Sequence, residues 1–513
     1  MPSLPDLIRE SAKCYGKYPS VITEKKKYSH AEIGLLSDRA AAGLAAKGVL
    51  KGDRVALYCM NSAEFAIAYV AIIKAGAVVV PINLMQKPAE VAYVLNDSTA
   101  KGLIYHSLFK ENAHQQIGSI SSLEFSICIG EEPVPSSLGW DSFLVNDLQV
   151  PTIQFEPDDD LAAILYTSGT TGRPKGAMLT HTNLVANTQS VVKAMKWQAG
   201  KDKVLLVLPM FHAFAATVGM LTPLTCGCAF IPLQKFDPDQ VVRTVEETTA
   251  TIFLAVPSMY NILLRIKDER VACFESIRFC VSGGASMPLE VMRRFEDKFQ
   301  KKVYEGDGPT ECSPVTCVNP IGGLTKPGTV GLPVPGVEMS IVDDAGKVLP
   351  IGEVGEIAVK GVSVMKGYWN LPEETAASFM GEWFLTGDLG TEDGDGYFSI
   401  VDRKKDMVIV NGMNVYPRII EEVLYRFKPV IEAAVIGEPD HLHGENVVAY
   451  VVVDSEAVSA VEVRGWCRDH LGGYEVPKKV FIVDELPKNA AGKILKRELR
   501  RQGEIERGVD LKG

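Results

Sequence analysis

The sequence predicts an α/β protein with three parts: a large N-terminal region of helix-covered, mostly parallel sheets, a β-rich subdomain, and a small α+β domain at the C-terminus. In the first half, apolar strand patterns alternate with helix patterns, which is typical of parallel sheets covered by helices. After about residue 320, glycines and prolines become frequent and short strand patterns replace helices. A charged segment at residues 402–406 then separates this region from a small α+β pattern.

The first half contains the clearest local signals. Ser29 and Glu32 form a capping-box pattern at the start of a helix that we expect to end near Gly48. A second helix begins after Asn61 or Ser62, either of which can cap it. The predicted strands of this half are short apolar runs at residues 54–59, 77–80, 203–208, 251–256 and 278–281.

Residues 214–233 form a long stretch without charge. Its length suits a membrane span. However, Gly219, Pro223, Gly227 and Pro232 divide it into short pieces. We therefore expect a buried helix followed by a core strand at this place.

The second half predicts two smaller units. The strand patterns of the β-rich subdomain lie at residues 338–342, 355–359 and 396–401. The C-terminal pattern consists of a helix at 416–427, strands at 433–436 and 447–453, and a helix at 460–470. We predict an N-terminal domain of residues 1–403, with its β-rich subdomain at about 320–403, and a C-terminal domain of residues 404–513.

The composition is that of an ordinary globular protein. Hydrophobic residues make up 46% and charged residues 23%, which excludes a disordered chain. The 53 Lys and Arg against 64 Asp and Glu give a net charge of −11, which excludes non-specific nucleic-acid binding. Ten cysteines without zinc-site spacing predict buried, reduced thiols. Because the N-terminus has no signal-peptide pattern, we predict a soluble cytoplasmic protein without an integral membrane segment. The oligomeric state stays open between a monomer and a homodimer.

The strongest chemical signal is the segment at residues 164–176, where an apolar strand runs into a loop rich in Gly, Thr and Ser. Small residues let backbone N–H groups approach an anion, hydroxyl groups add donors, and Lys175 adds a positive charge. The segment lacks the spacing of the common nucleotide P-loop, and Pro174 and Gly176 argue against a helix that starts at the lysine. We interpret it as a phosphate-binding loop rather than a flexible surface loop.

Other candidate functional residues stand on predicted loops. Glu311 lies in a Gly/Pro turn. It is either a Mg²⁺ ligand beside phosphates or part of an exposed acidic turn. Asp388, expected just after a short strand, can accept ribose hydroxyls, and Arg403 either assists it or is solvated. His212 alone is typical of a core histidine, and Lys493 lies on a Gly-containing loop. The basic residues that follow are interpreted as a solvated helix face: Lys496, Arg497, Arg500 and Arg501.

Together, these segments resemble the adenylate-forming family, which includes acyl-CoA synthetases, firefly luciferase and peptide-synthetase adenylation domains. The resemblance covers nearly the whole chain, with the motifs in the family's order and spacing. Its signature is residues 166–176, and the further motifs are Thr310-Glu311, residues 386–388, Asp402-Arg403, residues 412–417 and Gly492-Lys493. Within the family, residues 210–214, 401–406 and 414–417 look most like bacterial fatty-acyl-CoA ligases.

The resemblance implies an ATP-dependent carboxylate–CoA ligase that acts on a fatty acid. ATP converts the carboxylate to an acyl-adenylate with release of pyrophosphate, and the thiol of coenzyme A then displaces AMP. Two alternatives remain open, namely the same chemistry on an aromatic or alicyclic acid, and an adenylate-binding protein without catalysis. A serine hydrolase is a weak third candidate, since the segment at residues 361–365 ends in Met rather than the Gly of a nucleophile elbow.

The resemblance also implies roles for individual residues. The β- and γ-phosphates would be held by Thr167, Ser168, Gly169, Thr170, Thr171 and Lys175. Adenine would be flanked by Gly284, Ala285, Glu305, Gly306, Asp307 and Gly308, and the ribose bound by Asp388 and Arg403. The catalytic set would be Lys493, His212, Thr310 and Glu311, with Glu311 as the Mg²⁺ ligand.

In the family, the C-terminal domain rotates between the two reaction steps, so the small domain is expected to be mobile. The hinge would be Lys405, and rotation would remove Lys493 and bring Asn411 and Gly412 to the pantetheine tunnel. One position departs from the family pattern. Asp307 stands where the family usually has a tyrosine that packs on adenine. Because an aspartate cannot stack on a ring, adenine packing at this position must be rebuilt or weakened.

Overall fold

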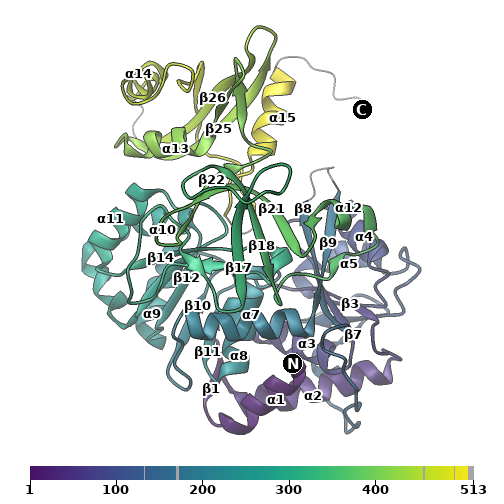
Figure 1. The fold of residues 1–513 in the computed structure, drawn as a ribbon. Helices are drawn as coiled ribbons and strands as arrows, with labels where there is room; N and C mark the ends of the chain where they lie inside the picture. The colour runs from purple at the N-terminus through teal and green to yellow at the C-terminus, as the bar shows by residue number, and fades with distance from the viewer. Residues whose placement is uncertain (132, 169–172, 455–456, 490–491, 507–513) are drawn as a thin grey trace.

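A smaller C-terminal lobe sits on a larger N-terminal part in the computed structural model of the chain (Figure 1). The structure describes residues 1–131, 133–168, 173–454, 457–489 and 492–506. Helix-covered sheets, a β-rich subdomain and an α+β lobe follow one another along the chain, so the predicted fold class is confirmed. The boundaries of the domains and the mobility of the C-terminal lobe stay predictions.

One sheet of the N-terminal part has the strand order β19-β9-β8-β4-β3-β5-β6-β7. Its central strands are parallel, and β9 and β19 add antiparallel strands at one edge. The strands are β3 (Arg54–Tyr58), β4 (Val78–Pro81), β5 (Gly102–His106), β6 (Phe125–Ile129), β7 (Leu138–Gly139), β8 (Leu161–Ser168), β9 (Pro174–Thr180) and β19 (Gly367–Tyr368).

A second sheet has the order β16-β15-β14-β13-β12-β10-β11-β1-β2. Its strands from β14 to β1 run parallel, as the alternating pattern predicts. They are β1 (Pro19–Ile22), β2 (Lys27–Ser29), β10 (Lys203–Leu206), β11 (Ala229–Pro232), β12 (Ile252–Ala255), β13 (Phe279–Ser282), β14 (Val303–Asp307), β15 (Cys317–Val318) and β16 (Leu332–Pro333).

Local capping sets the helix starts of this part. Ser29 and Glu32 form the predicted capping box of α2, and Ser62 rather than Asn61 caps α3. The α-helices are α1 (Leu4–Cys14), α2 (His30–Ala46), α3 (Ala63–Lys74), α4 (Pro88–Asp97), α5 (Lys110–Gln116), α6 (Trp140–Leu144), α7 (His181–Ala194), α8 (Thr222–Cys226), α9 (Pro238–Thr248), α10 (Pro257–Leu263) and α11 (Leu289–Phe299). Short 3₁₀ helices are η1 (Ser107–Phe109), η3 (Asp268–Ser276) and η4 (Thr310–Cys312).

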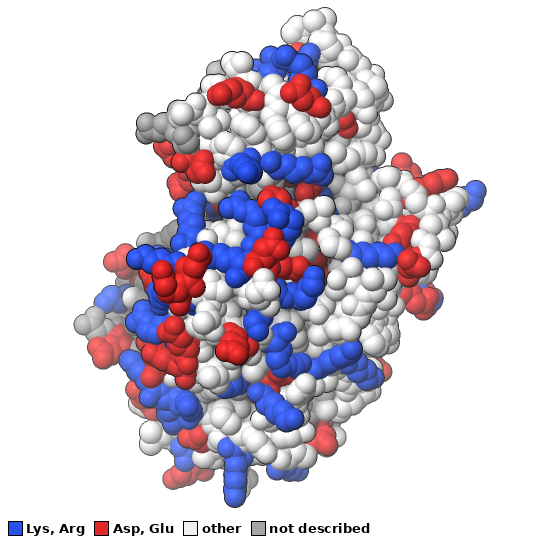
Figure 2. All heavy atoms as spheres, turned by 90° about the vertical axis from the view of Figure 1, so that its left-hand side faces the viewer, with Lys and Arg blue, Asp and Glu red and all other residues white. Residues whose placement is uncertain are grey.

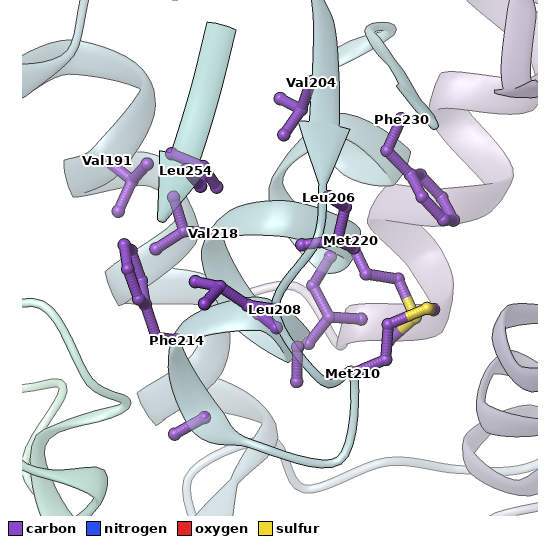
Figure 3. Packing of buried hydrophobic residues seen from close by; sticks show 14 of the residues in the cluster. Val191, Val204, Leu206, Leu208, Met210, Phe214, Val218, Met220, Phe230 and Leu254 are labelled. Carbon is purple, nitrogen blue, oxygen red and sulfur yellow. The ribbon is translucent and has the colours of Figure 1, made fainter. Parts of the chain in front are cut away.

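The uncharged stretch at residues 214–233 is a buried helix and a core strand, as predicted. Its helix begins as a π-helix, η2 (Ala215–Leu221), continues into α8, and leads to β11. Figure 3 shows Val218 of η2 beside Val191 and Leu254, and Met220 of η2 beside Leu206 of β10. No helix of the described residues is long and apolar enough to cross a bilayer.

The β-rich subdomain is an antiparallel sheet with the order β17-β18-β21-β20, to which β22 adds beside β21. Its elements are β17 (Val337–Val342), β18 (Gly355–Gly361), α12 (Pro372–Ala377), β20 (Phe379–Met380), β21 (Trp383–Glu392) and β22 (Phe398–Arg403). The turn at residues 393–397 joins β21 to β22 as a tight hairpin, which brings the two strands into direct register.

The C-terminal lobe has a sheet with the order β24-β23-β26-β25, and β27 pairs with β26. Val435 and Ile436 of β25 point to opposite faces and belong to separate hydrophobic clusters, so helices cover both faces. The elements are β23 (Val408–Val410), β24 (Met413–Val415), α13 (Pro417–Arg426), β25 (Val430–Asp440), β26 (Gly444–Val453), α14 (Ala460–His470), β27 (Lys479–Ile482) and α15 (Lys496–Glu506).

Two sequence predictions about side chains have clear outcomes. All ten cysteines are described and carry free thiols, as predicted, but the prediction that they are buried is wrong for Cys14, which is exposed, and for Cys226 and Cys273, which are partly buried. The prediction of a solvated basic face on α15 is wrong for two residues. Lys496 pairs with Glu421 at 2.8 Å and Arg500 pairs with Asp406 at 2.7 Å, because α15 packs against the lobe beside these carboxylates. Arg497 and Arg501 are exposed.

Candidate active site

The predicted phosphate-binding loop connects two antiparallel strands. Thr167 near the end of β8 lies opposite Lys175 near the start of β9. A strand, not a helix, follows the loop, as Pro174 and Gly176 predict. Of the predicted phosphate contacts, Gly169, Thr170 and Thr171 lie outside the described residues, and Ser168 is the last residue of β8.

Lys175 is held at the site by residues that the motif does not contain. Its ammonium group forms an ion pair with Glu374 of α12 and lies 5.3 Å from the ring centroid of Tyr368. Tyr368 reaches this position because β19 pairs with β9, with Tyr368 opposite Ala177. No local signal in the sequence predicts this long-range pairing.

Glu311 faces the phosphate-binding loop from η4. Its Oε1 accepts a hydrogen bond from the Tyr368 hydroxyl at 2.8 Å and from the Thr167 hydroxyl at 3.4 Å. Thr310 is the neighbouring residue at the start of η4. The described residues contain no cluster of three or more His, Cys, Asp and Glu side chains that could hold a metal alone. A single carboxylate beside a phosphate site nevertheless fits Mg²⁺, which typically takes one or two carboxylates together with substrate phosphates.

Asp388 and Arg403 form a pair across the β21–β22 hairpin. They lie opposite each other in the strand register, and the guanidinium Nε is 2.6 Å from the carboxylate. The expectation that Asp388 follows a short strand is wrong, because β21 continues through it to Glu392. Burial raises the pKa of Asp388 to about 6, although the Arg403 guanidinium favours its ionised form. The strand thus fixes a carboxylate where the predicted ribose site needs acceptors.

The end of β14 carries two carboxyl groups, of which Glu305 is buried and Asp307 is partly buried. Glu305 accepts a hydrogen bond from the Met287 N–H at 2.9 Å, and its Oε2 has no partner among the described residues. Burial raises the pKa of Glu305 to about 7. A Cβ at Gly308 would lie 1.9 Å from the Pro314 carbonyl oxygen, so only glycine fits there.

Asp307 occupies a partly buried position among cations. Burial raises its pKa, and the Arg403 guanidinium opposes that shift. The side chains of Lys493 and Arg418 also favour its ionised form. Both of these cations come from the C-terminal lobe. The residue that stands in place of the family's tyrosine therefore faces three cations, which partly offset the cost of burying its charge.

Lys493 reaches into a narrow pocket of the N-terminal part. The pocket is lined by Leu208, Pro209, His212, Phe214, Val256, Gly284, Asn489 and Lys493. The lysine loop is anchored there, since its Gly492 carbonyl accepts a hydrogen bond from the Ser258 hydroxyl at 3.1 Å. Burial and the nearby Arg403 lower the pKa of Lys493 to about 8.

His212 is a neutral imidazole at neutral pH, since burial and the neighbouring Lys493 lower its pKa to about 4. Its Nδ1 accepts a hydrogen bond from the Phe214 N–H at 3.4 Å, which leaves Nε2 as the donor. Gly284 lines the same pocket with a φ of +78°, and Ala285 follows it. The interpretation of His212 as a core histidine is therefore incomplete, because its side chain borders a pocket.

Three predicted residues lie away from this cluster. Asn411 and Gly412 form the exposed turn between β23 and β24, with φ angles of +53° and +78°. The turn is tied to the lobe by the Asn411 N–H, which donates to the His443 carbonyl at 2.8 Å. Lys405 is exposed in the turn after β22. The structure therefore brings Lys493, but not Asn411 and Gly412, to the other site residues.

We expect the pH dependence of adenylate formation to report two of these groups. Asp388 should act ionised and Lys493 protonated, so kcat/KM for ATP should fall below about pH 6 and again above about pH 8. Asp307→Asn should move the alkaline limb to lower pH, because the Asp307 carboxylate raises the pKa of Lys493. Pyrophosphate exchange measured from pH 5 to pH 10 checks both statements. An alkaline limb that Asp307→Asn leaves in place contradicts the assignment to Lys493.

Comparisons with known proteins cover nearly all of the chain. A family model described as AMP-binding enzyme matches residues 8–369, and one described as AMP-binding enzyme C-terminal domain matches residues 419–493. The chain is 35% identical to a long-chain-fatty-acid–CoA ligase of Bacillus subtilis (strain 168), over 97% of this chain and 94% of the relative. It is 38% identical to a feruloyl-CoA synthase of Amycolatopsis sp, over 92% of this chain and 94% of the relative.

A solved structure resembles the chain over nearly its whole length. It is ATP-bound MatB from Rhodopseudomonas palustris, with a TM-score of 0.89, 34% identity, and coverage of 97% of this chain and 98% of that one. The apo form of the same protein has the same identity and coverage but a TM-score of 0.78. The arrangement of this chain is therefore closer to the ATP-bound form than to the apo form.

Proposed function

We propose that the acid substrate of this chain is a fatty acid. The chain belongs to the AMP-binding enzyme family, and its relatives over nearly the whole chain, long-chain-fatty-acid–CoA ligases, make it an AMP-forming acyl-CoA synthetase. The enzyme joins a carboxylic acid to coenzyme A at the expense of ATP. The first step brings an anionic carboxylate onto the α-phosphate of ATP, so the site must neutralise like charges. The second step transfers the acyl group from AMP to the thiol.

The observation that carries the fatty-acid proposal is the wall of the Lys493 pocket. Next to Lys493 and His212, the pocket is lined by Leu208, Pro209, Phe214 and Val256, whose side chains are apolar. An alkyl chain gains free energy by leaving water for such surfaces, roughly 0.8 kcal/mol for each buried CH₂ group. The Bacillus relative, a long-chain-fatty-acid–CoA ligase, supports the same substrate class.

Each charged residue then has a role in adenylate formation. Lys175 and the loop before it would bind the β- and γ-phosphates, and Glu311 would hold Mg²⁺, which neutralises phosphate charge when bound. Asp388 and Arg403 would bind the ribose hydroxyls. Lys493 would bridge the acid carboxylate and the α-phosphate, where negative charge accumulates. Thr310 would contact the α-phosphate from the start of η4.

The thioester step would use a second arrangement of the same chain. Residues 1–403 would form the fixed domain, and residues 404–513 would rotate about Lys405 as a mobile domain. Lys405 is exposed in a turn between β22 and β23, and such a position suits a hinge. Rotation would withdraw Lys493 and bring the exposed Asn411–Gly412 turn to the pantetheine arm of coenzyme A.

An aromatic acid is the second candidate substrate. The Amycolatopsis relative, a feruloyl-CoA synthase, is 38% identical to this chain. The Phe214 ring in the pocket wall can pack against an aromatic ring as well as against an alkyl chain.

Turnover with a panel of acids tests the proposed function. We expect release of AMP and pyrophosphate with ATP, Mg²⁺, coenzyme A and fatty acids, and a kcat/KM for fatty acids at least about tenfold above that for ferulate or benzoate, which is 1.4 kcal/mol of selectivity. Chain lengths from four to eighteen carbons belong in the panel. Higher kcat/KM for the aromatic acids would replace the fatty-acid proposal. Binding of ATP by calorimetry without turnover of any acid would leave only an adenylate-binding protein.

A further inference from the structure

Helices α11 and α13 lie side by side across the junction between the two lobes (Figure 1). Helix α11 (Leu289–Phe299) follows the glycine segment that contains Gly284 and Ala285, and therefore continues from the predicted adenine wall. Helix α13 (Pro417–Arg426) is the first helix of the C-terminal lobe after Lys405. A contact between these helices thus links the nucleotide site directly to the position of the mobile lobe.

The first backbone N–H of α11 is capped from the other lobe. The N-cap residue of α11 is Pro288, whose side chain cannot cap the helix. Instead, Glu422 of α13 accepts a hydrogen bond from the Leu289 N–H at 3.2 Å. A carboxylate at this place satisfies a free donor and interacts favourably with the positive end of the helix dipole.

A second charged residue of α13, Arg418, lies opposite carboxyl groups of the N-terminal part. Arg418 lies one turn before Glu422, so both side chains are on one side of α13. The Arg418 guanidinium donates to the Ile400 carbonyl, and its backbone N–H donates to the Asp402 carboxylate at 2.9 Å. Its positive charge also faces Glu305 and Asp307 at the end of β14.

Charges alternate along this junction. The negative Glu422 meets the positive end of α11, and the positive Arg418 meets buried carboxyl groups. Figure 2 shows Lys and Arg on both sides of the junction on this face, with acidic residues between them. Glu422 also raises the pKa of the buried Glu305, and Arg418 beside it acts in the opposite direction, so Arg418 offsets the repulsion between these two carboxyl groups.

We propose that Glu422 is a positioning residue that caps α11 across the lobe junction and thereby holds Lys493 in the adenylation pocket. The inference rests on the proposed function, in which Lys493 serves adenylate formation. The hydrogen bond of Glu422 goes to the Leu289 backbone rather than to a predicted site residue, although its charge also raises the pKa of Glu305. Its effect on the reaction passes through the lobe, since the Leu289 contact must break when the C-terminal lobe rotates away. The closer match to the ATP-bound comparison structure supports this assignment to the adenylating arrangement.

The test separates the two half-reactions in Glu422→Ala. Losing a helix cap of this kind costs about 1 kcal/mol, so ATP–pyrophosphate exchange should slow about fivefold to tenfold. The transfer from supplied acyl-AMP to coenzyme A should keep the wild-type rate or rise above it, because that step does not need this arrangement. Glu422→Gln keeps an acceptor without the charge and should recover part of the lost exchange rate.

A matched control and a structural measurement complete the experiment. Glu462→Ala removes a helix cap inside the same lobe, where Glu462 accepts from the Ser459 N–H at 2.8 Å and is exposed. It should leave the ratio of the two half-reactions unchanged. In hydrogen–deuterium exchange, Glu422→Ala should raise exchange in the peptide that contains Leu289, whereas Glu462→Ala should not.

The outcomes distinguish this inference from the proposed function. Equal slowing of both half-reactions, or no slowing of either, overturns the positioning role of Glu422. Unchanged exchange at Leu289 in Glu422→Ala overturns the cap itself. If the wild-type protein forms no adenylate with any acid, the proposed function fails, while the exchange measurement still tests the contact between the lobes.

Discussion

Lys493→Ala should slow adenylate formation by at least about a hundredfold, because it removes from the pocket the cation that we propose to stand where charge builds up between carboxylate and α-phosphate. Transfer of the acyl group from supplied acyl-AMP to coenzyme A should remain within about threefold of wild type, since Lys493 is expected to leave the site before that step. Pyrophosphate exchange measures the first step, and thioester formation from synthetic acyl-AMP measures the second.

Lys478→Ala is a suitable control for this substitution. Lys478 is an exposed lysine of the same lobe, so its loss changes the net charge equally without touching the pocket. Both half-reactions should be unaffected by it. Equal loss of both half-reactions in Lys493→Ala would contradict the use of two lobe arrangements, and full retention of exchange would remove Lys493 from the catalytic set.

Local patterns in the sequence predict much of the fold because their causes are local. Ser29 and Glu32 satisfy each other's backbone donors, so the start of α2 needs no tertiary contact. The strand patterns between residues 54 and 281 are apolar on both faces, as parallel strands buried by helices must be. The π-helical form of η2 has no such local signal, since it depends on packing against β10 and α7.

The candidate site, like the fold, has some features that local sequence predicts and others that depend on tertiary packing. Motifs predict roles for residues whose chemistry is carried by the residue itself, such as Lys493, Glu311 and Arg403. They do not identify groups that act through long-range register. Tyr368 bonds to Glu311 only because β19 pairs with β9, and Glu422 reaches α11 only because the lobes dock. Sequence spacing carries no trace of these contacts, which arise from tertiary packing.

The position of Asp388 illustrates how a strand boundary changes the chemistry. A residue placed just after a strand would be free to move with its loop. Because β21 continues through Asp388, the backbone is fixed by pairing with β22, and Arg403 is held directly opposite. The predicted ribose site is therefore a rigid pair of strands rather than a flexible loop, which lowers the entropy cost of binding.

Asp388→Ala should raise the KM for ATP by roughly tenfold to 150-fold for each hydrogen bond lost, because a hydrogen bond to a charged acceptor contributes about 1.5–3 kcal/mol and the variant loses the proposed acceptor of the ribose hydroxyls. It also leaves the Arg403 guanidinium, 2.6 Å from that carboxylate in the wild type, without its partner. Isothermal calorimetry with ATP and steady-state kinetics measure the loss.

The change in stability of Asp388→Ala should be modest, which separates a binding defect from misfolding. The Arg403 side chain is 41% exposed, so water solvates much of the unpaired cation. We therefore expect a loss of about 1–2 kcal/mol in the free energy of unfolding rather than the larger cost of a fully buried broken pair. Asp395→Asn, in the exposed turn of the same hairpin, should change neither KM nor stability by more than about 0.5 kcal/mol. A KM for ATP that stays at the wild-type value in Asp388→Ala would exclude this carboxylate from the ribose site, and the strand pair would then serve only to hold the hairpin together.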